Sequence, residues 1–358
     1  MMIDSCIADI KELADRIGRS VTLMEVCGTH TMAAFRTGVK GLLPDSVHLL
    51  SGPGCPVCVT PNEYLDKAIA ISDERDVLIS TFGDMVRVPG SYSSLERKRA
   101  QGADIRVVYS PLDALETARE EPGKRVVFLG VGFETTTPAV AWTIDEAKRA
   151  GITNYSVLCA HKTIPGAMSA LLADGKVSVD GFMCPGHVSV IIGAGAYEPL
   201  CEKYNAPCVV AGFEAGDILR AIRALLKQIA DNRGEVENEY ARSVTQEGNF
   251  RARAACERVF EECSAEWRGL GVIPDSGLKI REEFEAQDAG KLFAGIKVPE
   301  SRKESGCICG DILRGMRQPG DCSLFGDRCT PSMPVGACMV SSEGTCAAHF
   351  KYGRKKNG

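Results

Sequence analysis

Short apolar runs, each followed by a polar or glycine-rich turn, alternate with helical patterns from residue 21 onward. Eight runs have the length and composition of buried strands: residues 21–26, 47–50, 76–80, 105–109, 125–130, 155–160, 181–184 and 206–212. Five other segments place apolar residues at helical spacing: residues 62–72, 93–101, 137–150, 164–173 and 214–230. Strands that alternate with helices predict an α/β protein with parallel sheets covered on both faces.

Short sequences that recur within the chain favour two similar sheets over a single one. The CPVC sequence at residues 55–58 is echoed by CPGH at residues 184–187. The GFE sequence at residues 132–134 recurs at residues 212–214. Both pairs stand at the ends of predicted strands, so they indicate two related α/β units.

The two ends of the chain depart from this pattern. Residues 4–18 predict an amphipathic helix, and the charged residues 231–270 predict a pair of helices that lead out of the α/β region. Residues 300–350 are rich in Cys, Gly, Pro and Ser and contain few apolar runs. Such a segment buries little apolar surface, and in a reducing compartment a metal centre is the expected source of its stability.

Composition excludes several classes of function. The 358 residues suffice for two or three domains, and the net charge of −5 argues against binding to nucleic acid. No apolar stretch has the ~18–20 residues that cross a bilayer, and residues 1–18 lack the basic start and apolar core of a secretory signal. We therefore expect a cytoplasmic protein with no membrane partner. In that compartment its sixteen cysteines serve metal binding or redox chemistry rather than disulfide pairing.

A CxxC motif, Cys55 to Cys58, follows the second predicted strand. This spacing lets two sulfurs form a disulfide or share a metal ion. After a strand in a cytoplasmic α/β protein it indicates a redox dithiol whose surrounding glycines and prolines hold the thiols at the surface. The alternative is half of a zinc site.

Cys27 follows the first predicted strand, and His30 lies three residues further on. A nearby imidazole or a helix N-terminus lowers the pKa of a thiol and makes it a metal ligand or a nucleophile. The alternative is a small buried hydrophobic residue.

The segment Glu134-Thr135-Thr136-Thr137 follows the fifth predicted strand. One threonine is expected to cap the following helix, with Pro138 in its first turn. Capping needs one hydroxyl, so the remaining groups favour a ligand-binding role. Parallel strands border a crevice with their carboxyl ends, and the motifs after the strands are therefore expected to converge there.

The C-terminal segment carries six cysteines within 40 residues, at positions 307, 309, 322, 329, 338 and 346. The set Cys309, Cys322, Cys329 and Cys346 supplies four thiolates, the number that holds a 4Fe–4S cluster. The spacing matches neither a bacterial ferredoxin nor the paired CxxC motifs of a zinc ribbon, so zinc stays the alternative.

Four motifs together resemble the HypD family of hydrogenase maturation factors. They are CGTHT at residues 27–31, GPGCPVC at 52–58, GFETTTPA at 132–139 and MVSSEGTCAA at 339–348, in the order of that family. The resemblance implies two similar α/β domains that face a cleft and a third domain with a 4Fe–4S cluster. We expect an N-terminal helix (1–20) that packs on the C-terminal part, α/β domains at 21–122 and 123–232, and a helical connection with the cysteine-rich domain at 233–358.

The resemblance also implies a function in maturing nickel–iron hydrogenase. Such a protein acts with a small HypC-type partner as a scaffold for iron that acquires two cyanides and one carbon monoxide, and a HypE-type partner delivers the cyanide. The family's iron-binding cysteine corresponds to Cys27 and its redox dithiol to Cys55 and Cys58. The cluster ligands correspond to the four cysteines above, with Cys307 and Cys338 as alternatives for the fourth.

The mechanism expected from this resemblance makes the protein an assembly scaffold rather than a conventional turnover enzyme. The cluster reduces the dithiol, which gates iron loading or ligand addition, while His30, Glu134, Thr135 and Thr136 position ligands or relay protons. Two other functions fit the residues: a stand-alone iron–sulfur protein that reduces disulfides of other proteins, and a zinc-stapled binding module.

Overall fold

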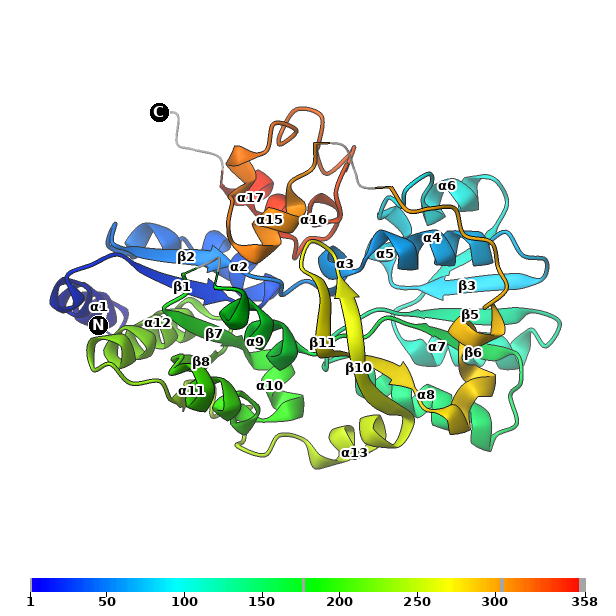
Figure 1. Ribbon diagram of the computed structural model, residues 1–358, viewed down its shortest axis with the longest axis horizontal. Coiled ribbons are helices and arrows are strands. Elements are labelled where there is room, and N and C mark those ends of the chain that lie inside the picture. The colour runs from blue at the N-terminus through cyan, green and yellow to red at the C-terminus, as the bar shows by residue number, and fades with distance from the viewer. Residues whose placement is uncertain (1, 176–177, 303–305, 354–358) are drawn as a thin grey trace.

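Two parallel sheets, formed from strands far apart in the sequence, organise the molecule (Figure 1). The computed structural model describes residues 2–175, 178–302 and 306–353. The first sheet has the order β2 (Val47–Ser51), β1 (Val21–Glu25), β7 (Gly181–Pro185), β8 (Cys208–Ala211) and β9 (Val236–Asn238). The second has the order β4 (Asp104–Val107), β3 (Val77–Thr81), β5 (Arg125–Gly130) and β6 (Tyr155–Cys159). The parts built on these sheets are called the first and the second lobe.

The helices between the strands have the following bounds. In the first half they are α1 (Met2–Ile17), α2 (Gly28–Arg36), η1 (Val39–Leu42), α3 (Pro56–Val59), α4 (Asn62–Ile71), α5 (Gly83–Arg87), α6 (Leu95–Ala100), α7 (Pro111–Glu120), α8 (Thr137–Arg149) and α9 (Ile164–Asp174). They continue with α10 (Gly186–Ile192), η2 (Ala194–Tyr197), α11 (Glu198–Tyr204), α12 (Ala215–Ala230), α13 (Phe250–Val259), η3 (Glu282–Gln287), α14 (Ala289–Leu292), α15 (Cys309–Arg314), η4 (Pro319–Asp321), α16 (Ala337–Val340) and α17 (Thr345–Tyr352).

Both faces of each sheet are buried, as the sequence predicts. In β1, Met24 faces one apolar core while Leu23 faces another. In β5, Phe128 and Val127 are divided between two cores in the same way. Because successive side chains of a strand point to opposite faces, a continuous apolar run is the pattern that a sheet covered on both sides requires. The α/β class and all eight predicted strands are confirmed.

The boundary predicted between residues 122 and 123 does not separate the two sheets. Strands β5 and β6 lie after it but pair with β3, and β7 pairs with β1. The first lobe therefore combines residues near the N-terminus with residues after 160, and the second lobe is inserted between them. Apolar runs report that a strand is buried but not which strand lies beside it, so the sequential division missed this arrangement.

The N-terminal helix α1 packs on α12 of the first lobe, not on the C-terminal part as predicted. Ile10 and Ala14 of α1 are buried in one core with Ile218 and Leu225 of α12. The two helices are both amphipathic, and each buries its apolar stripe against the other.

The predicted helix pair at 231–270 is only partly present. Helix α13 forms, but β10 (Phe260–Trp267) and β11 (Gly271–Ile280) make an antiparallel hairpin. Phe260 and Trp267 at the ends of β10 are buried, while the six residues between them alternate between half-buried and exposed. This is the period of a strand with one solvated face, which the high charge of the segment obscured.

The cysteine-rich region, residues 306–353, lies across the junction of the two lobes (orange to red in Figure 1). Helix α17 contacts α2, and α16 contacts α3. Over the described ranges, the helices lack the length and apolar character needed to span a membrane.

Candidate functional site

Two loops of the first lobe meet the cysteine-rich region at closely packed glycines. The Gly28 N–H, at the start of α2, donates a hydrogen bond of 3.1 Å to the carbonyl of Gly54. A Cβ atom at position 54 would overlap the backbone of Cys27, and one at position 28 would overlap the backbone of Glu343. Only glycine allows these approaches, so the loops after β1 and β2 and the turn before α17 are fixed against one another.

Cys27 stands at the meeting point of these loops. It precedes α2 with extended backbone geometry and is 9% exposed. Burial, together with the nearby carboxylate of Glu343, raises the pKa of its thiol to about 11. The same carboxylate accepts a hydrogen bond of 2.7 Å from the Thr29 hydroxyl. The free thiol is thus protonated near neutral pH, and an electropositive ligand such as a metal ion would favour its deprotonation.

His30 does not activate the Cys27 thiol in the way the spacing predicts. Its Nε2 lies 3.2 Å from the carbonyl oxygen of Ala211 and 3.0 Å from that of Gly212, so it carries the proton. Burial lowers the pKa of His30 to about 4. The neutral ring keeps Nδ1 without a hydrogen-bond partner among the described residues, which leaves a buried base three residues from Cys27.

His187 and Glu343 extend this site, although the sequence motifs assign a role to neither residue. The ring of Phe213 stacks against that of His30, with centroids 4.6 Å apart, and against that of His187, with centroids 3.9 Å apart. Burial lowers the pKa of His187 and the charge of Glu343 opposes that shift. His187 follows β7 in the CPGH echo of the CxxC motif, and this position was the available sequence signal.

A buried carboxylate supports the same edge of the first sheet. Glu25, the last residue of β1, accepts a hydrogen bond of 2.8 Å from the Thr31 hydroxyl, which also lies 3.1 Å from Ser51. Lys40 lies 3.8 Å from the same carboxylate oxygen. The CGTHT motif is thus anchored through its last threonine, a role that the sequence pattern did not reveal.

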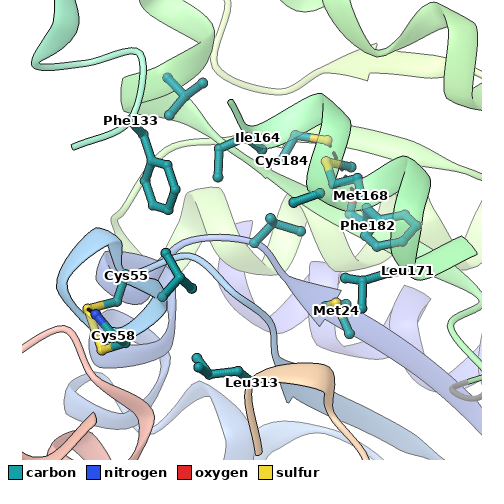
Figure 2. Close-up of a cluster of buried hydrophobic side chains, with 14 of the residues drawn as sticks. Met24, Cys55, Cys58, Phe133, Ile164, Met168, Leu171, Phe182, Cys184 and Leu313 are labelled. Atoms are coloured by element: carbon teal, nitrogen blue, oxygen red, sulfur yellow. Dashed lines mark hydrogen bonds between the residues drawn. A yellow bond between two sulfur atoms is a disulfide. The ribbon is translucent and has the colours of Figure 1, made fainter. Parts of the chain in front are cut away.

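Cys55 and Cys58 are joined as a disulfide, with their Cα atoms 5.3 Å apart. Pro56 opens the short helix α3 between them, and the Cys58 N–H lies 3.3 Å from the Cys55 sulfur. The residues are 3% and 0% exposed, so the prediction that the motif holds its sulfurs at the surface is wrong. Figure 2 shows the pair beside the sulfur-rich core that includes Met24 and Cys184.

The six cysteines of the C-terminal segment gather around one small cavity. Its wall includes Cys307, Cys309, Cys322, Cys329, Cys338 and Cys346, and its other residues are apolar or glycine. The Val335 N–H points to the Cys329 sulfur at 3.3 Å. Burial raises the pKa of Cys346, and the sulfurs of Cys309 and Cys307 raise it further.

In the described wall of this cavity, sulfur atoms are the only side-chain atoms that can bind a metal. The wall offers none of the oxygen ligands that hard cations require. The set exceeds the four thiolates of a 4Fe–4S cluster, so these residues fit such a group and include all four predicted ligands. Cys307 and Cys338 line the same wall, so both stay alternatives for the fourth position. Among the described residues, no three His, Cys, Asp or Glu side chains converge on a point suited to a single metal ion.

The disulfide adjoins this cavity. The Cys58 sulfur lies 4.0 Å from the carbonyl oxygen of Ala337, and the next residue, Cys338, is part of the cavity wall. Val57 packs against the core that contains Ala337. The dithiol pair and the six-cysteine cavity are therefore separated by a single peptide unit.

Glu134, Thr135 and Thr136 occupy a different part of the molecule. Glu134 lines a cavity whose wall includes neither Cys27 nor the disulfide. Thr135 is exposed, and the Thr136 hydroxyl donates to the carbonyl of Phe133 at 3.2 Å. The predicted threonine cap of α8 is absent, because the Thr136 and Thr137 hydroxyls turn back to that carbonyl, but Pro138 stands in the first turn as predicted. The preceding residue, Phe133, shares an apolar core with Cys55 and Cys58.

Fold and site define a two-lobed α/β protein with a buried disulfide beside a six-cysteine cavity. Residues 1–353 match the family model described as "HypD: Hydrogenase formation hypA family". The chain belongs to the HypD family of hydrogenase maturation factors, as its motifs predict.

Curated relatives match almost the whole chain. It is 49% identical over 356 residues to the hydrogenase maturation factor HypD of Rhodobacter capsulatus, covering 97% of this chain and 94% of that protein. It is 48% identical over 362 residues to the hydrogenase expression/formation protein HupD of Azotobacter chroococcum mcd 1, with 98% and 95% covered. Identity to HypD of Cupriavidus necator is 48% over 350 residues, with 96% and 92% covered.

Proposed function

We propose that this protein is a scaffold for assembling the iron group of a nickel–iron hydrogenase. On it, together with a HypC-type partner, an iron atom acquires two cyanides and one carbon monoxide, and a HypE-type partner delivers the cyanide. The names of the relatives support a role in hydrogenase maturation, and such a role implies work with other maturation proteins.

Cys27 is the residue that we assign to the iron cargo. Its thiol is buried at the meeting point of three segments, and thiolate sulfur is a soft ligand suited to iron that carries cyanide and carbonyl. His30, whose Nδ1 has no hydrogen-bond partner among the described residues, is the residue that we assign to position the ligands of the iron. A cysteine of the HypC-type partner would supply a second sulfur.

The six-cysteine cavity and the disulfide supply the redox part of the proposal. A 4Fe–4S cluster held by Cys309, Cys322, Cys329 and Cys346 would supply electrons one at a time. Cys58 lies against Ala337, so the disulfide is positioned to accept them across one peptide unit. Gly54, which precedes Cys55, packs on the backbone of Cys27. Opening or closing the disulfide would therefore change the loop that holds the iron-binding residue.

The observation that carries the proposal is this sequence of contacts from the cavity to the disulfide and on to Cys27. Buried positions of this kind are poorly suited to binding a large external substrate but well suited to holding a small metal group away from water. Glu134, Thr135 and Thr136 lie outside this set of contacts, so we assign the chemistry to Cys27, His30 and the disulfide.

The test is to co-express the chain with a HypC-type partner and a HypE-type protein without oxygen and to record the infrared spectrum of the purified complex. We expect cyanide and carbonyl stretching bands in the wild type and in Cys6→Ala, which removes a buried cysteine of α1 that belongs to a different core from the disulfide. Cys27→Ala should lose the bands and keep the visible absorption of the cluster. Bands that persist in Cys27→Ala would refute the assignment of iron to this residue.

A stand-alone disulfide reductase is the second candidate, because the disulfide adjoins the cavity directly. This function needs no iron at Cys27. Iron and sulfide without infrared bands, together with reduction of a protein disulfide by the chemically reduced chain, would favour it. Zinc without iron in the anaerobic protein would instead indicate a structural metal site.

A further inference from the structure

The hairpin β10–β11 has no part in the proposed assembly of the iron group, yet its tip reaches the disulfide. The tip, residues 267–271, points toward the cysteine-rich region and lies beside α3 (Figure 1). Trp267 is fully buried in the apolar core that contains Cys55 and Cys58, and Leu270 packs against the same core. The indole N–H of Trp267 donates a hydrogen bond of 2.8 Å to Ser276 on the opposite strand, so the tip is tied to the rest of the hairpin.

Arg268 joins the tip to the loop that follows the disulfide. Its backbone N–H donates a hydrogen bond of 2.8 Å to the carbonyl of Val59, the last residue of α3. Its Nε–H donates one of 2.9 Å to the carbonyl of Thr60. The last carbonyls of a helix have no partner within the helix itself, so the tip supplies donors where α3 lacks them. Because Cys58 directly precedes Val59, these bonds hold the end of the helix that carries the disulfide.

Gly269 joins the tip to the cysteine-rich region. It has a φ of 80°, and a Cβ atom at this position would overlap the backbone of Gly310. Gly310 belongs to α15 and directly follows Cys309, which lines the six-cysteine cavity. A Cβ atom at position 310 would in turn stand 2.8 Å from the Cα of Gly269. The two backbones thus touch directly, and only glycine at both positions allows this approach.

The tip therefore connects the two elements between which the disulfide is buried. The Cys58 sulfur faces the carbonyl of Ala337 in the cysteine-rich region, 4.0 Å away. A groove of about 440 Å³ runs beside the tip, and its described wall includes Cys307 and Cys309 but neither Cys55 nor Cys58. A small molecule in this groove meets the cysteine-rich region and not the disulfide.

We propose that the hairpin tip positions the cysteine-rich region over the Cys55–Cys58 disulfide and so closes this pair to free thiols. Arg268 and Gly269 are the positioning residues: Arg268 holds the loop after Cys58, and Gly269 holds α15. Thiol–disulfide exchange requires a thiolate to reach one of the two sulfurs, and the tip denies that approach. The inference rests on the redox role proposed for the disulfide, because a pair open to free thiols would take their electrons instead of those from the six-cysteine cavity.

The rate at which dithiothreitol opens the disulfide in the full chain, without oxygen, tests this role. Each opened bond turns one dithiothreitol into its cyclic disulfide and leaves two protein thiols, so electrons and protons balance. The new thiols of Cys55 and Cys58 are alkylated and counted by mass spectrometry over time. Gly269→Ala forces a Cβ atom against Gly310, and the disulfide of this variant should open about tenfold faster than that of the wild type.

Gly271→Ala is the matched control, because this glycine has nearly the same φ, 79°, and open space around it. Both substitutions place alanine at a positive φ, but only Gly269→Ala disturbs the contact with α15. Gly271→Ala should therefore keep the wild-type rate. Gly310→Ala disturbs the same contact from the other side without a positive φ. It should also speed the opening, and it decides the question if Gly269→Ala does not fold.

The thiol of Cys208, buried in β8 of the first sheet, reports on general loosening of the fold. Its alkylation should stay at the wild-type rate in every variant. Wild-type rates of disulfide opening in Gly269→Ala and Gly310→Ala would overturn the proposal. So would an equal gain in Gly271→Ala, or alkylation of Cys208 that speeds up together with the opening. The result is separable from iron assembly, because the infrared bands report on Cys27 and the opening rate reports on the hairpin tip.

Discussion

The imidazole of His161 gives the fold a sensitivity to acid that can be calculated. It is 1% exposed in the turn after β6, with Nδ1 3.5 Å from the Cys159 sulfur and its ring 5.6 Å from that of Phe260. Burial, with the positive charge of Lys162, lowers the pKa of His161 to about 3. In the unfolded chain this pKa returns to about 6.5.

These two pKa values determine whether the free energy of unfolding rises or falls with pH. Between them the unfolded state binds the proton and the folded state does not, so stability falls as the pH falls below about 6.5. The contribution of His161 is fully present above that pH. From pH 7 to pH 5 the free energy of unfolding should decrease by about 2 kcal/mol on account of this residue alone, at about 1.4 kcal/mol per pKa unit.

The perturbation is His161→Asn, which removes the titrating group and keeps a polar amide. The free energy of unfolding is measured in urea at pH 7, 6 and 5 from tryptophan fluorescence, since Trp267 is fully buried. The other buried histidines titrate in both proteins, so the difference between the slopes isolates His161. From pH 7 to pH 5, the free energy of unfolding of the variant should fall by about 2 kcal/mol less than that of the wild type.

His48 supplies the control, because it is exposed on β2. His48→Asn should keep the pH dependence of the wild type. Parallel slopes for the wild type and His161→Asn would refute the reasoning, since they would mean that the buried imidazole is protonated in the fold or already neutral in the unfolded chain.

Two further substitutions test individual contacts. Ser276→Ala removes the acceptor of the Trp267 indole N–H, 2.8 Å away, and should lower the free energy of unfolding by about 1–3 kcal/mol in urea, whereas Ser264→Ala on the exposed side of β10 should leave it unchanged. Gly54→Ala forces a methyl group against the backbone of Cys27 and should weaken the cyanide and carbonyl bands while the cluster absorption persists; Gly41→Ala, with open space around it, is the control, and equal bands in both would contradict the packing argument.

The sequence predicted where the strands lie along the chain better than it predicted which strands pair with one another. Each strand can be identified from its own residues, because both of its faces are buried and its residues form an apolar run. Pairing depends on contacts between distant segments: Leu23 lies opposite Gly181 in the register of β1 and β7. Neither apolar run indicates that the other is its neighbour, so the hydrophobic pattern could not predict the order of strands within the sheets.

In the candidate site, too, local features could be predicted from the sequence, and features that depend on tertiary contacts could not. The cysteine motifs could be identified because sulfur spacing is local, and the structure gathers all four predicted cluster ligands around one cavity. Burial could not be predicted at this level. It places the Cys55–Cys58 pair in the interior and neutralises His30. Glu134 was expected beside Cys27, but the inserted second lobe carries it to the other cavity.

The contacts around Gly54 decide whether the disulfide and Cys27 can act separately. Gly54 contacts Cys27 through its backbone on one side and is bonded to Cys55 on the other. A disulfide across two intervening residues constrains both the α3 helix and the residue before it, since the two Cα atoms must stay close enough to be bridged. Reduction removes that constraint at a position where the packing leaves no room for a Cβ atom. Any movement of the loop therefore moves Cys27 or opens a gap beside it, and the redox state of the pair is coupled to the geometry of Cys27.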